Sequence, residues 1–136
     1  RILTGALYDA LPEGWELWYD GGHNEAAGRI LADQAALWAA QDDKPLHLIL
    51  GMKHTKDPKR FIAPILPHIS SLTKAAIGDD SSVFEDLGGR TLAFIHDTPI
   101  YDYQNPRDYV EKVCTAAKGR VLVTGSLYFK NMKNIF

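Results

Sequence analysis

The amino-acid sequence predicts an α/β fold in which a mostly parallel β-sheet lies between layers of helices. Short apolar segments alternate along the chain with longer segments whose apolar residues recur at the helical period. Segment 47–51 is almost continuously apolar, which is typical of a strand buried on both faces of a parallel sheet. Strands and helices that alternate in this way favour crossover connections and a three-layer, Rossmann-like domain.

The first part of the chain predicts the order strand, helix, strand. The aromatic segment Trp15–Tyr19 lies between a Pro-Glu-Gly turn and a pair of glycines, which indicates a strand. From Asn24 onward, small and apolar residues follow a period close to 3.6, and the polar, proline-containing segment 42–45 ends the pattern. We therefore expect a helix here, followed by the strand 47–51.

The rest of the chain continues the alternation. Residues 57–58, Asp-Pro, form a typical N-cap and first helical residue, and the short helix that follows is expected to reach Pro67. A second Asx-Pro pair at 105–106 opens a helix predicted to run to about Ala117. Segment 78–89 can hold a short capped helix. The remaining predicted strands are 72–77, 91–95, 100–103 and 120–124.

Composition indicates one soluble domain. The 136 residues match the usual length of a single domain, so we expect one domain over residues 1–136. Apolar residues make up 46% and charged residues 24%, and no apolar run is long enough to cross a membrane. The net charge is −2 and no basic cluster stands out, which argues against nucleic acid as a partner.

Two single residues bear on the cellular setting. Cys114 lies in the apolar phase of a predicted helix, so we expect it to pack as a small hydrophobe. One cysteine without a partner fits the reducing cytoplasm. The chain starts at Arg1 and carries no targeting pattern, so we expect a piece cut from a longer cytoplasmic polypeptide.

The predicted sheet indicates where ligands bind. In open parallel sheets, ligands bind beyond the carboxyl ends of the strands. The loops that follow the predicted strands are 20–24, 51–57, 76–82 and 125–128.

The turn from Asp20 to Asn24 is chemically the richest of these loops. The Asp20 carboxylate follows a strand and can accept from a hydroxyl, an amine or the water shell of a cation. The two glycines permit close approach of a ligand. His23 and Asn24 begin the helix, whose amides and dipole favour a carboxylate or a phosphate. The alternative is a structural turn in which Asn24 only caps the helix.

Two other loops carry polar groups. Thr124 and Ser126 supply hydroxyls after the last strand, although a plain Gly-Ser turn is the alternative. Lys56 and Asp57 put charges after another strand, or form a solvated pair. The five histidines are dispersed, so no metal site is expected within this domain. The chain has no phosphate-loop, dinucleotide-binding or nucleophile-elbow motif.

Three of these segments, each after a predicted strand, resemble a known family. They are Leu17-Trp18-Tyr19-Asp20-Gly21-Gly22-His23-Asn24, Leu50-Gly51-Met52 with Thr55-Lys56-Asp57, and Val121-Leu122-Val123-Thr124-Gly125-Ser126-Leu127-Tyr128. Together they resemble the C-terminal domain of folylpolyglutamate synthase and dihydrofolate synthase, within the Mur ligase superfamily. The resemblance implies the three-layer, Rossmann-like fold of the Mur ligase C-terminal domain.

The resemblance also implies an activity for the longer protein. Enzymes of this family use ATP and Mg²⁺ to convert a folate or dihydropteroate carboxylate into an acyl phosphate, which the amine of L-glutamate attacks. ATP and Mg²⁺ are bound mainly by a separate N-terminal ATPase domain, so this domain alone is expected to be inactive.

By resemblance, three residues contact ligands. Asp20 contacts the nucleotide, at its ribose or an adjacent water, while His23 and Ser126 lie on the glutamate side. Asn24, Lys56 and Asp57 are expected to support the loops. No catalytic residue and no metal ligand is expected within this domain alone.

Two other functions are compatible with such a fold. A nucleotide-dependent oxidoreductase is disfavoured, because no predicted strand is followed by the glycine fingerprint of that class. A noncatalytic module that binds a nucleotide or an anion stays open, because one α/β scaffold hosts many functions.

Overall fold

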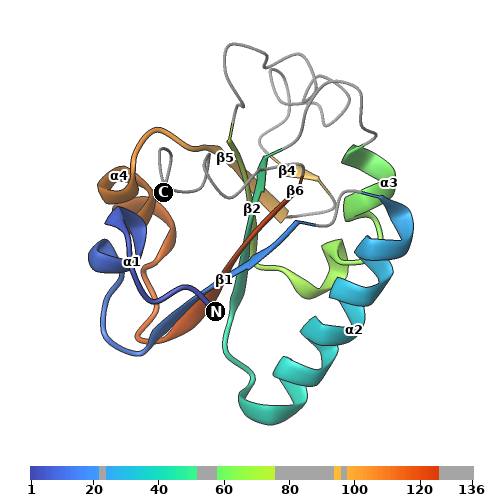
Figure 1. Ribbon diagram of the computed structural model, residues 1–136, viewed down its shortest axis with the longest axis horizontal. Helices are drawn as coiled ribbons and strands as arrows, with labels where there is room; N and C mark the ends of the chain where they lie inside the picture. The colour runs from blue at the N-terminus through green and yellow to red at the C-terminus, as the bar shows by residue number, and fades with distance from the viewer. Residues whose placement is uncertain (22–23, 52–57, 76–93, 96–97, 126–136) are drawn as a thin grey trace.

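The computed structural model of the chain describes residues 1–21, 24–51, 58–75, 94–95 and 98–125, and it confirms the α/β fold (Figure 1). Its centre is a six-stranded sheet in the order β1-β6-β2-β3-β5-β4. The strands β1, β6, β2, β3 and β5 pair in parallel with their neighbours in this order, and the short β4 pairs with β5 in the antiparallel direction. The strands are β1 (Trp15–Asp20), β2 (Leu46–Gly51), β3 (Ser71–Lys74), β4 (Phe94–Ile95), β5 (Thr98–Asp102) and β6 (Gly119–Gly125).

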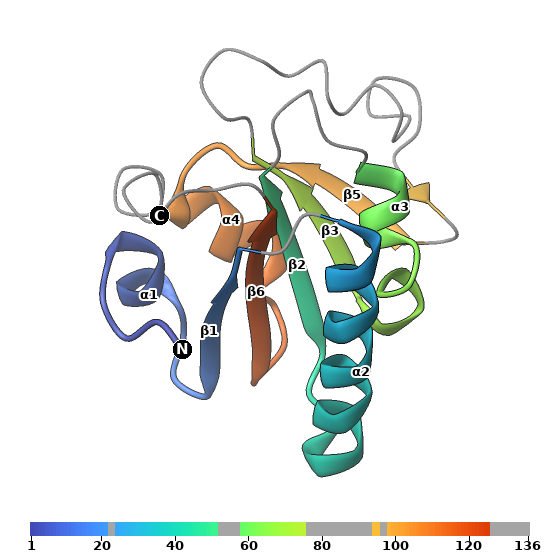
Figure 2. The ribbon, with the colours of Figure 1, turned by 45° about the vertical axis from the view of Figure 1, so that its right-hand side comes forward.

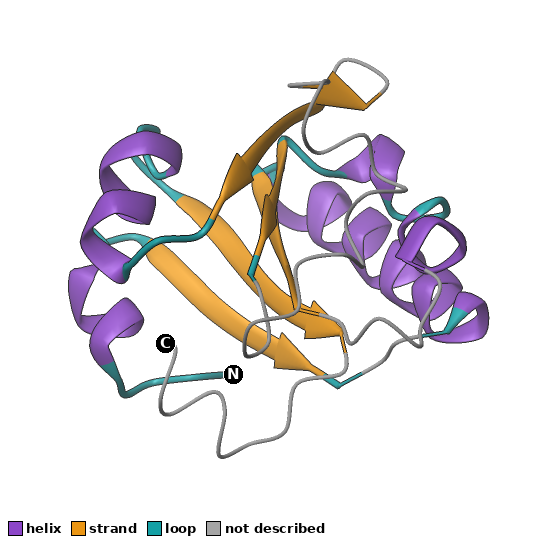
Figure 3. Ribbon diagram, turned by 90° about the horizontal axis from the view of Figure 1, so that it is seen from above, coloured by secondary structure: helices purple, strands orange, loops and turns teal. Residues whose placement is uncertain are grey.

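Helices cover both faces of this sheet. Figures 1 and 3 show α2 and α3 on one face and α1 and α4 on the other, so the predicted three layers are confirmed. The helices are α1 (Ala6–Ala10), α2 (Glu25–Asp42), α3 (Pro58–Ile62), the 3₁₀ turn η1 (Leu66–His68) and α4 (Pro106–Val113).

The order of the strands differs from their order in the sequence at β6 and at the pair β5 and β4, and the position of β6 decides which loops are neighbours. β6, the last strand, lies between β1 and β2, and it pairs in parallel with both. Two segments about a hundred residues apart in the chain are thereby neighbours in the sheet, as Figure 2 shows.

The alternation of side chains along the strands builds two cores. Leu48 and Leu50 of β2 face α2 and α3, together with Leu72 of β3 and Leu122 of β6. Ile49 faces the opposite side, where α1 and α4 pack over Val121 and Val123 and other residues. Each central strand contributes to both cores, which explains why its sequence is apolar at successive positions.

The two long helices begin as the sequence predicts. The side chain of Asn24 accepts a hydrogen bond from the Ala27 amide at 2.9 Å, and Asn105 accepts one from the Asp108 amide at 2.8 Å. Both are N-caps that satisfy amides in the first turn. Pro106, like Pro58, is the first residue of its helix.

Two helix ends differ from the prediction, and one helix was not predicted. The helix expected to reach Pro67 ends at Ile62, because Pro64 lacks an amide hydrogen; the chain then continues through a turn into η1. The helix expected to reach Ala117 ends at Val113, where the Cys114 backbone leaves helical geometry. The short helix α1 is not predicted from the sequence.

Cys114 has the packing role that the sequence predicts, and two of the tryptophans are also buried. Trp15 and Trp38 are buried on opposite faces of the sheet, while Trp18 is partly buried beside Trp38. Cys114 is buried against α1 and the sheet, and burial raises the pKa of its thiol to about 12. The thiol therefore stays protonated near neutral pH, which suits packing rather than nucleophilic chemistry.

Candidate functional site at the carboxyl edge of the sheet

The carboxyl ends of the five parallel strands meet at one edge of the sheet. Across this edge, strand register pairs the Cα atoms of Asp20 with Thr124, Thr124 with Leu50, Leu50 with Lys74, and Lys74 with Asp102. We call these five residues the carboxyl-edge row. They come from five strands that are far apart in the sequence.

All members of the carboxyl-edge row point to the same face. Leu50 belongs to the core under α2 and α3, and residues paired in register across parallel strands share a face. The row therefore faces the layer of α2 and α3. It combines two carboxylates, one hydroxyl and one ammonium on the side where α2 begins.

Asp20 occupies one end of the row and is exposed. On the opposite face, the neighbouring Tyr19 has a raised pKa, first because it is partly buried and second because of the negative charge of Asp20. Gly21 follows directly, and a Cβ atom there would lie 3.2 Å from the Tyr19 hydroxyl. Because glycine has no Cβ atom, it leaves enough space for the Tyr19 side chain beside the turn.

Asn24 is a helix cap in this structure. Its side-chain oxygen accepts from the Ala27 amide, and its carbonyl oxygen accepts from the Gly28 amide at 3.0 Å. The amide oxygen of its side chain is thus occupied by the N-cap of α2.

Four predicted residues, His23, Lys56, Asp57 and Ser126, lie outside the described residues. The described strand ends next to them are close in the sheet. Gly51 pairs in register with Gly125, in the row just beyond Leu50 and Thr124. The three motifs singled out in the sequence thus follow three adjacent strands, β1, β6 and β2.

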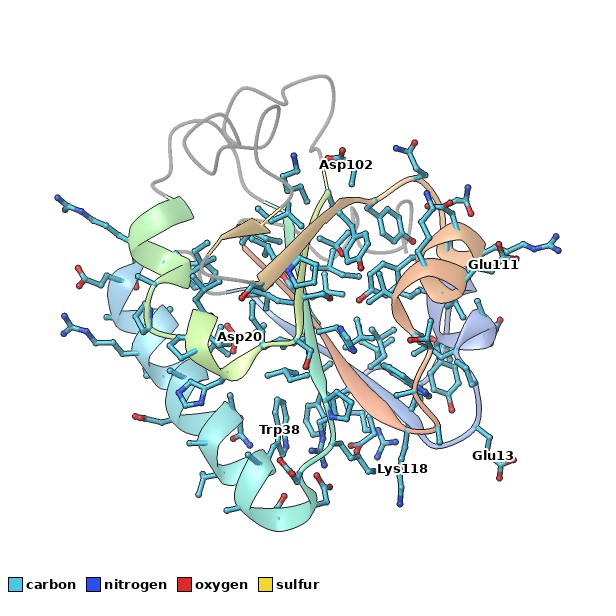
Figure 4. All side chains as sticks on the ribbon, turned by 180° about the vertical axis from the view of Figure 1, so that it is seen from behind. Glu13, Asp20, Trp38, Asp102, Glu111 and Lys118 are labelled. Atoms are coloured by element: carbon cyan, nitrogen blue, oxygen red, sulfur yellow. The ribbon has the colours of Figure 1, made fainter. Side chains whose placement is uncertain are left out.

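The structure adds an ion pair that sequence reasoning missed. Lys74 Nζ lies 3.1 Å from Asp102 Oδ1, and 8% of the Lys74 side chain is exposed compared with 66% for Asp102. Figure 4 labels Asp102 at the end of β5. The signal in the sequence was a lysine within the predicted strand 72–77.

A second charged cluster lies at the opposite, amino-terminal edge of the sheet. The Arg120 guanidinium donates two hydrogen bonds to the Asp42 carboxylate, at 2.9 and 2.7 Å, and also pairs with Glu16. It lies over the Trp38 ring, 5.0 Å from the ring centroid. The bonds from Arg120 lower the pKa of Asp42 to about 2. This cluster joins the end of α2 to β6 and β1.

Clefts also lie at this amino-terminal edge. One of about 620 Å³ is lined by residues that include Arg1, Tyr8 and Glu13, and one of about 260 Å³ by residues that include Trp38, His68 and Arg120. Glu16 and Lys44, which line the larger cleft, form an ion pair at 3.3 Å. Because Lys44 and Arg120 form ion pairs with both Glu16 and Asp42, we assign the clefts no ligand.

The described residues contain neither a membrane-spanning helix nor a metal-binding cluster. No helix there is long and apolar enough to cross a membrane. In the same part of the chain, no three His, Cys, Asp or Glu side chains lie together as a metal site would require. No protein-family model, no curated protein and no solved structure matches the chain.

Proposed function

We propose that this chain is the C-terminal domain of a cytoplasmic, ATP-dependent ligase that adds L-glutamate to a folate or to dihydropteroate. One observation carries the proposal. The three motifs that resemble this family follow β1, β2 and β6, and these strands are neighbours because β6 lies between the other two. A ligand contacted by all three motifs needs this adjacency, which the sequence order alone does not provide.

The chemistry available at the edge suits a binding role. In the proposed reaction the substrate carboxylate takes the terminal phosphoryl group of ATP, the glutamate amine attacks the acyl carbon, and phosphate leaves. Such a reaction depends mainly on positioning and on neutralising charge. Asp20 would accept from the nucleotide ribose or an adjacent water, and His23 and Ser126 would contact glutamate.

In the proposed enzyme, Mg²⁺ would lie between this domain and the N-terminal ATPase domain of the same protein. Mg²⁺ prefers oxygen ligands and keeps several waters beside substrate phosphates. Asp20 is an exposed carboxylate at the proposed nucleotide side and fits an outer contact to such waters. The principal Mg²⁺ ligands would belong to the protein's own N-terminal ATPase domain.

A noncatalytic module that binds a nucleotide or an anion is the second candidate. The observation that favours it is the buried Lys74 at the same edge, because a cation at the carboxyl end of a strand suits any anionic ligand. Both candidates use the same surface, so only turnover separates them.

A ligation assay tests the proposed function. The chain joined to its native upstream sequence is incubated with ATP, Mg²⁺, L-glutamate and either a folate or dihydropteroate, and the amide product is measured. We expect ATP-dependent amide formation by the longer protein and none by residues 1–136 alone. A longer protein that binds ATP and glutamate but forms no amide contradicts the ligase and favours the noncatalytic module.

A further inference from the structure

Lys74 is a buried cation at an edge where ligands are expected. Its side chain is 8% exposed, although it is the last residue of β3 and adjoins the proposed site. Removing an ammonium from water is costly unless an anion compensates for the lost hydration. Asp102 provides that charge at 3.1 Å, yet the Asp102 side chain itself is 66% exposed.

The backbone already holds Lys74 in place without the ion pair. The Lys74 carbonyl oxygen accepts from the Tyr103 amide at 2.8 Å, and the Leu50 carbonyl oxygen accepts from the Ala75 amide at 2.9 Å. These bonds continue the ladders of β3 with β5 and with β2. Replacing a buried ion pair by well-packed apolar residues is often neutral for stability, so the register of β3 alone gives no reason for a lysine at this position.

Asp102 and Lys74 differ in how readily each can leave the ion pair for water. The exposed Asp102 carboxylate can be rehydrated when an incoming anion takes over its contact with Lys74, so the exchange leaves neither charge without compensation. Lys74 stays in a poorly solvated position and keeps a strong attraction for any anion that arrives. An incoming carboxylate or phosphate can thus take the place of Asp102.

The remainder of the carboxyl-edge row sets the position of such an anion. Adjacent strands are about 4.8 Å apart, so Lys74 lies roughly 10 Å from Thr124 and roughly 14 Å from Asp20 along the row. Leu50 between Lys74 and Thr124 brings no charge. Lys74 is therefore the one cation of the row; it lies next to Asp102 at one end and three strands away from Asp20 at the other.

We propose that Lys74 binds an anionic oxygen of the ligand at the carboxyl edge and that Asp102 is the counterion which this oxygen displaces. The choice between the carboxylate of an amino acid and the phosphate of a nucleotide rests on the proposed function. The anion-binding role of Lys74 rests on the ion pair and its burial.

Titrations of the chain test this proposal. Inorganic phosphate and L-glutamate are titrated separately, with binding followed by NMR, into the wild-type chain and into Lys74→Met, Lys74→Arg and Asp102→Asn. Lys112→Met is the matched control, because Lys112 pairs with Asp108 at 3.0 Å on α4 with 58% of its side chain exposed. Thermal unfolding checks that each variant is folded.

We expect Lys74→Met to weaken binding of at least one of the two anions by about tenfold or more, as for the loss of a charged hydrogen bond. Lys74→Arg should stay within a few-fold of wild type. Asp102→Asn should bind equally or more tightly, because the competing carboxylate is gone. Lys112→Met should have no effect. Weaker phosphate binding assigns Lys74 to the nucleotide, and weaker glutamate binding assigns it to the amino acid.

Several results overturn the proposal. They are a wild-type chain that binds neither anion, a folded Lys74→Met chain that binds both as wild type does, and an Asp102→Asn chain that binds more weakly. If Lys74→Met does not fold, the Lys74→Arg and Asp102→Asn titrations decide.

The ligation assay separates this inference from the proposed function. A longer protein that makes no amide, while its anion binding still depends on Lys74, rejects the ligase and retains the anion site. A longer protein that makes the amide with unchanged dependence on ATP and glutamate after Lys74→Met retains the ligase and rejects the anion site.

Discussion

The Asp20 side chain is exposed to solvent, while its backbone is held in the sheet. Asp20 is the last residue of β1, and register with Thr124 holds its backbone in the sheet while its carboxylate reaches solvent. A residue placed in this way can contact a ligand without contributing much to the core.

Replacing Asp20 with alanine in the longer protein should therefore change ligand binding more than folding. Loss of one charged acceptor is worth about 1.5 to 3 kcal/mol, so we expect the apparent KM for ATP to rise roughly tenfold or more. Steady-state kinetics at saturating glutamate measure this, and thermal unfolding should change little. Asp33→Ala, at an exposed position on α2, is the control. An unchanged dependence on ATP would reject the nucleotide role.

His47 makes stability depend on pH. It is buried, its Nδ1 lies 2.7 Å from the Ser71 hydroxyl, and it stacks on Trp15. Burial lowers its pKa from 6.5 to about 4. The unfolded chain thus takes up a proton below pH 6.5, whereas the folded chain does so only near pH 4.

The stability from His47 should be fully present above pH 6.5 and should fall as the pH drops toward 4. The difference in pKa corresponds to a loss on the order of 3 kcal/mol over this range. His47→Asn removes the titrating group, so its unfolding free energy should vary less with pH. Urea unfolding at pH 4.5, 5.5 and 7 measures both proteins. If the unfolding free energies of the wild-type chain and His47→Asn vary equally with pH, His47 is not held neutral in the folded chain.

At the scale of elements, α2 packs closely on α3. A Cβ atom at Gly28 would collide with the Phe61 carbonyl oxygen, so the two helices need a glycine at this contact. In an exposed helix Gly→Ala stabilises by about 1 kcal/mol, but overpacking costs about 1 to 3 kcal/mol.

We expect the overpacking to dominate, so that Gly28→Ala lowers the unfolding free energy measured in urea. Asp33→Ala on the exposed side of the same helix should leave it unchanged or raise it slightly. A stabilised Gly28→Ala protein would contradict the close packing.

The end of α2 is attached to the sheet by Arg120 and Asp42. Asp42 has its pKa lowered to about 2 by the hydrogen bonds from Arg120, compared with 3.8 for an ordinary aspartate. Its contribution is thus present above pH 3.8 and is lost as the pH falls toward 2. Asp42→Asn should lower Tm at pH 7, and the difference from wild type should shrink between pH 4 and 2. A constant difference would argue against the ion pair.

The sequence indicates most elements because their signals are local. The apolar runs of β2 and β6 and the Asn caps of α2 and α4 depend on a few neighbouring residues. The boundaries that differ depend on single residues within a helical pattern, such as Pro64. A short helix such as α1, with only Leu7 buried, leaves almost no periodic pattern to detect.

At the scale of the whole molecule, the candidate site depends on topology. The sequence predicts that ligands bind beyond the strands, but the position of β6 between β1 and β2 depends on pairing across the whole chain. The neighbourhood of Asp20 and Thr124 could therefore not be derived from local patterns. Lys74 was missed for a related reason, because its partner Asp102 comes from another strand.

On the proposed function, ligands bind at the carboxyl edge of the sheet and not in the amino-terminal clefts. The most direct measurement is an NMR titration of the assigned chain with ATP and with L-glutamate, following every backbone amide. We predict that the shift changes concentrate at Asp20, Gly21, Gly51, Ala75 and Gly125. Changes confined to Glu16, Lys44 and Arg120 at the opposite edge, or no changes at millimolar ligand, would contradict ligand binding at the carboxyl edge.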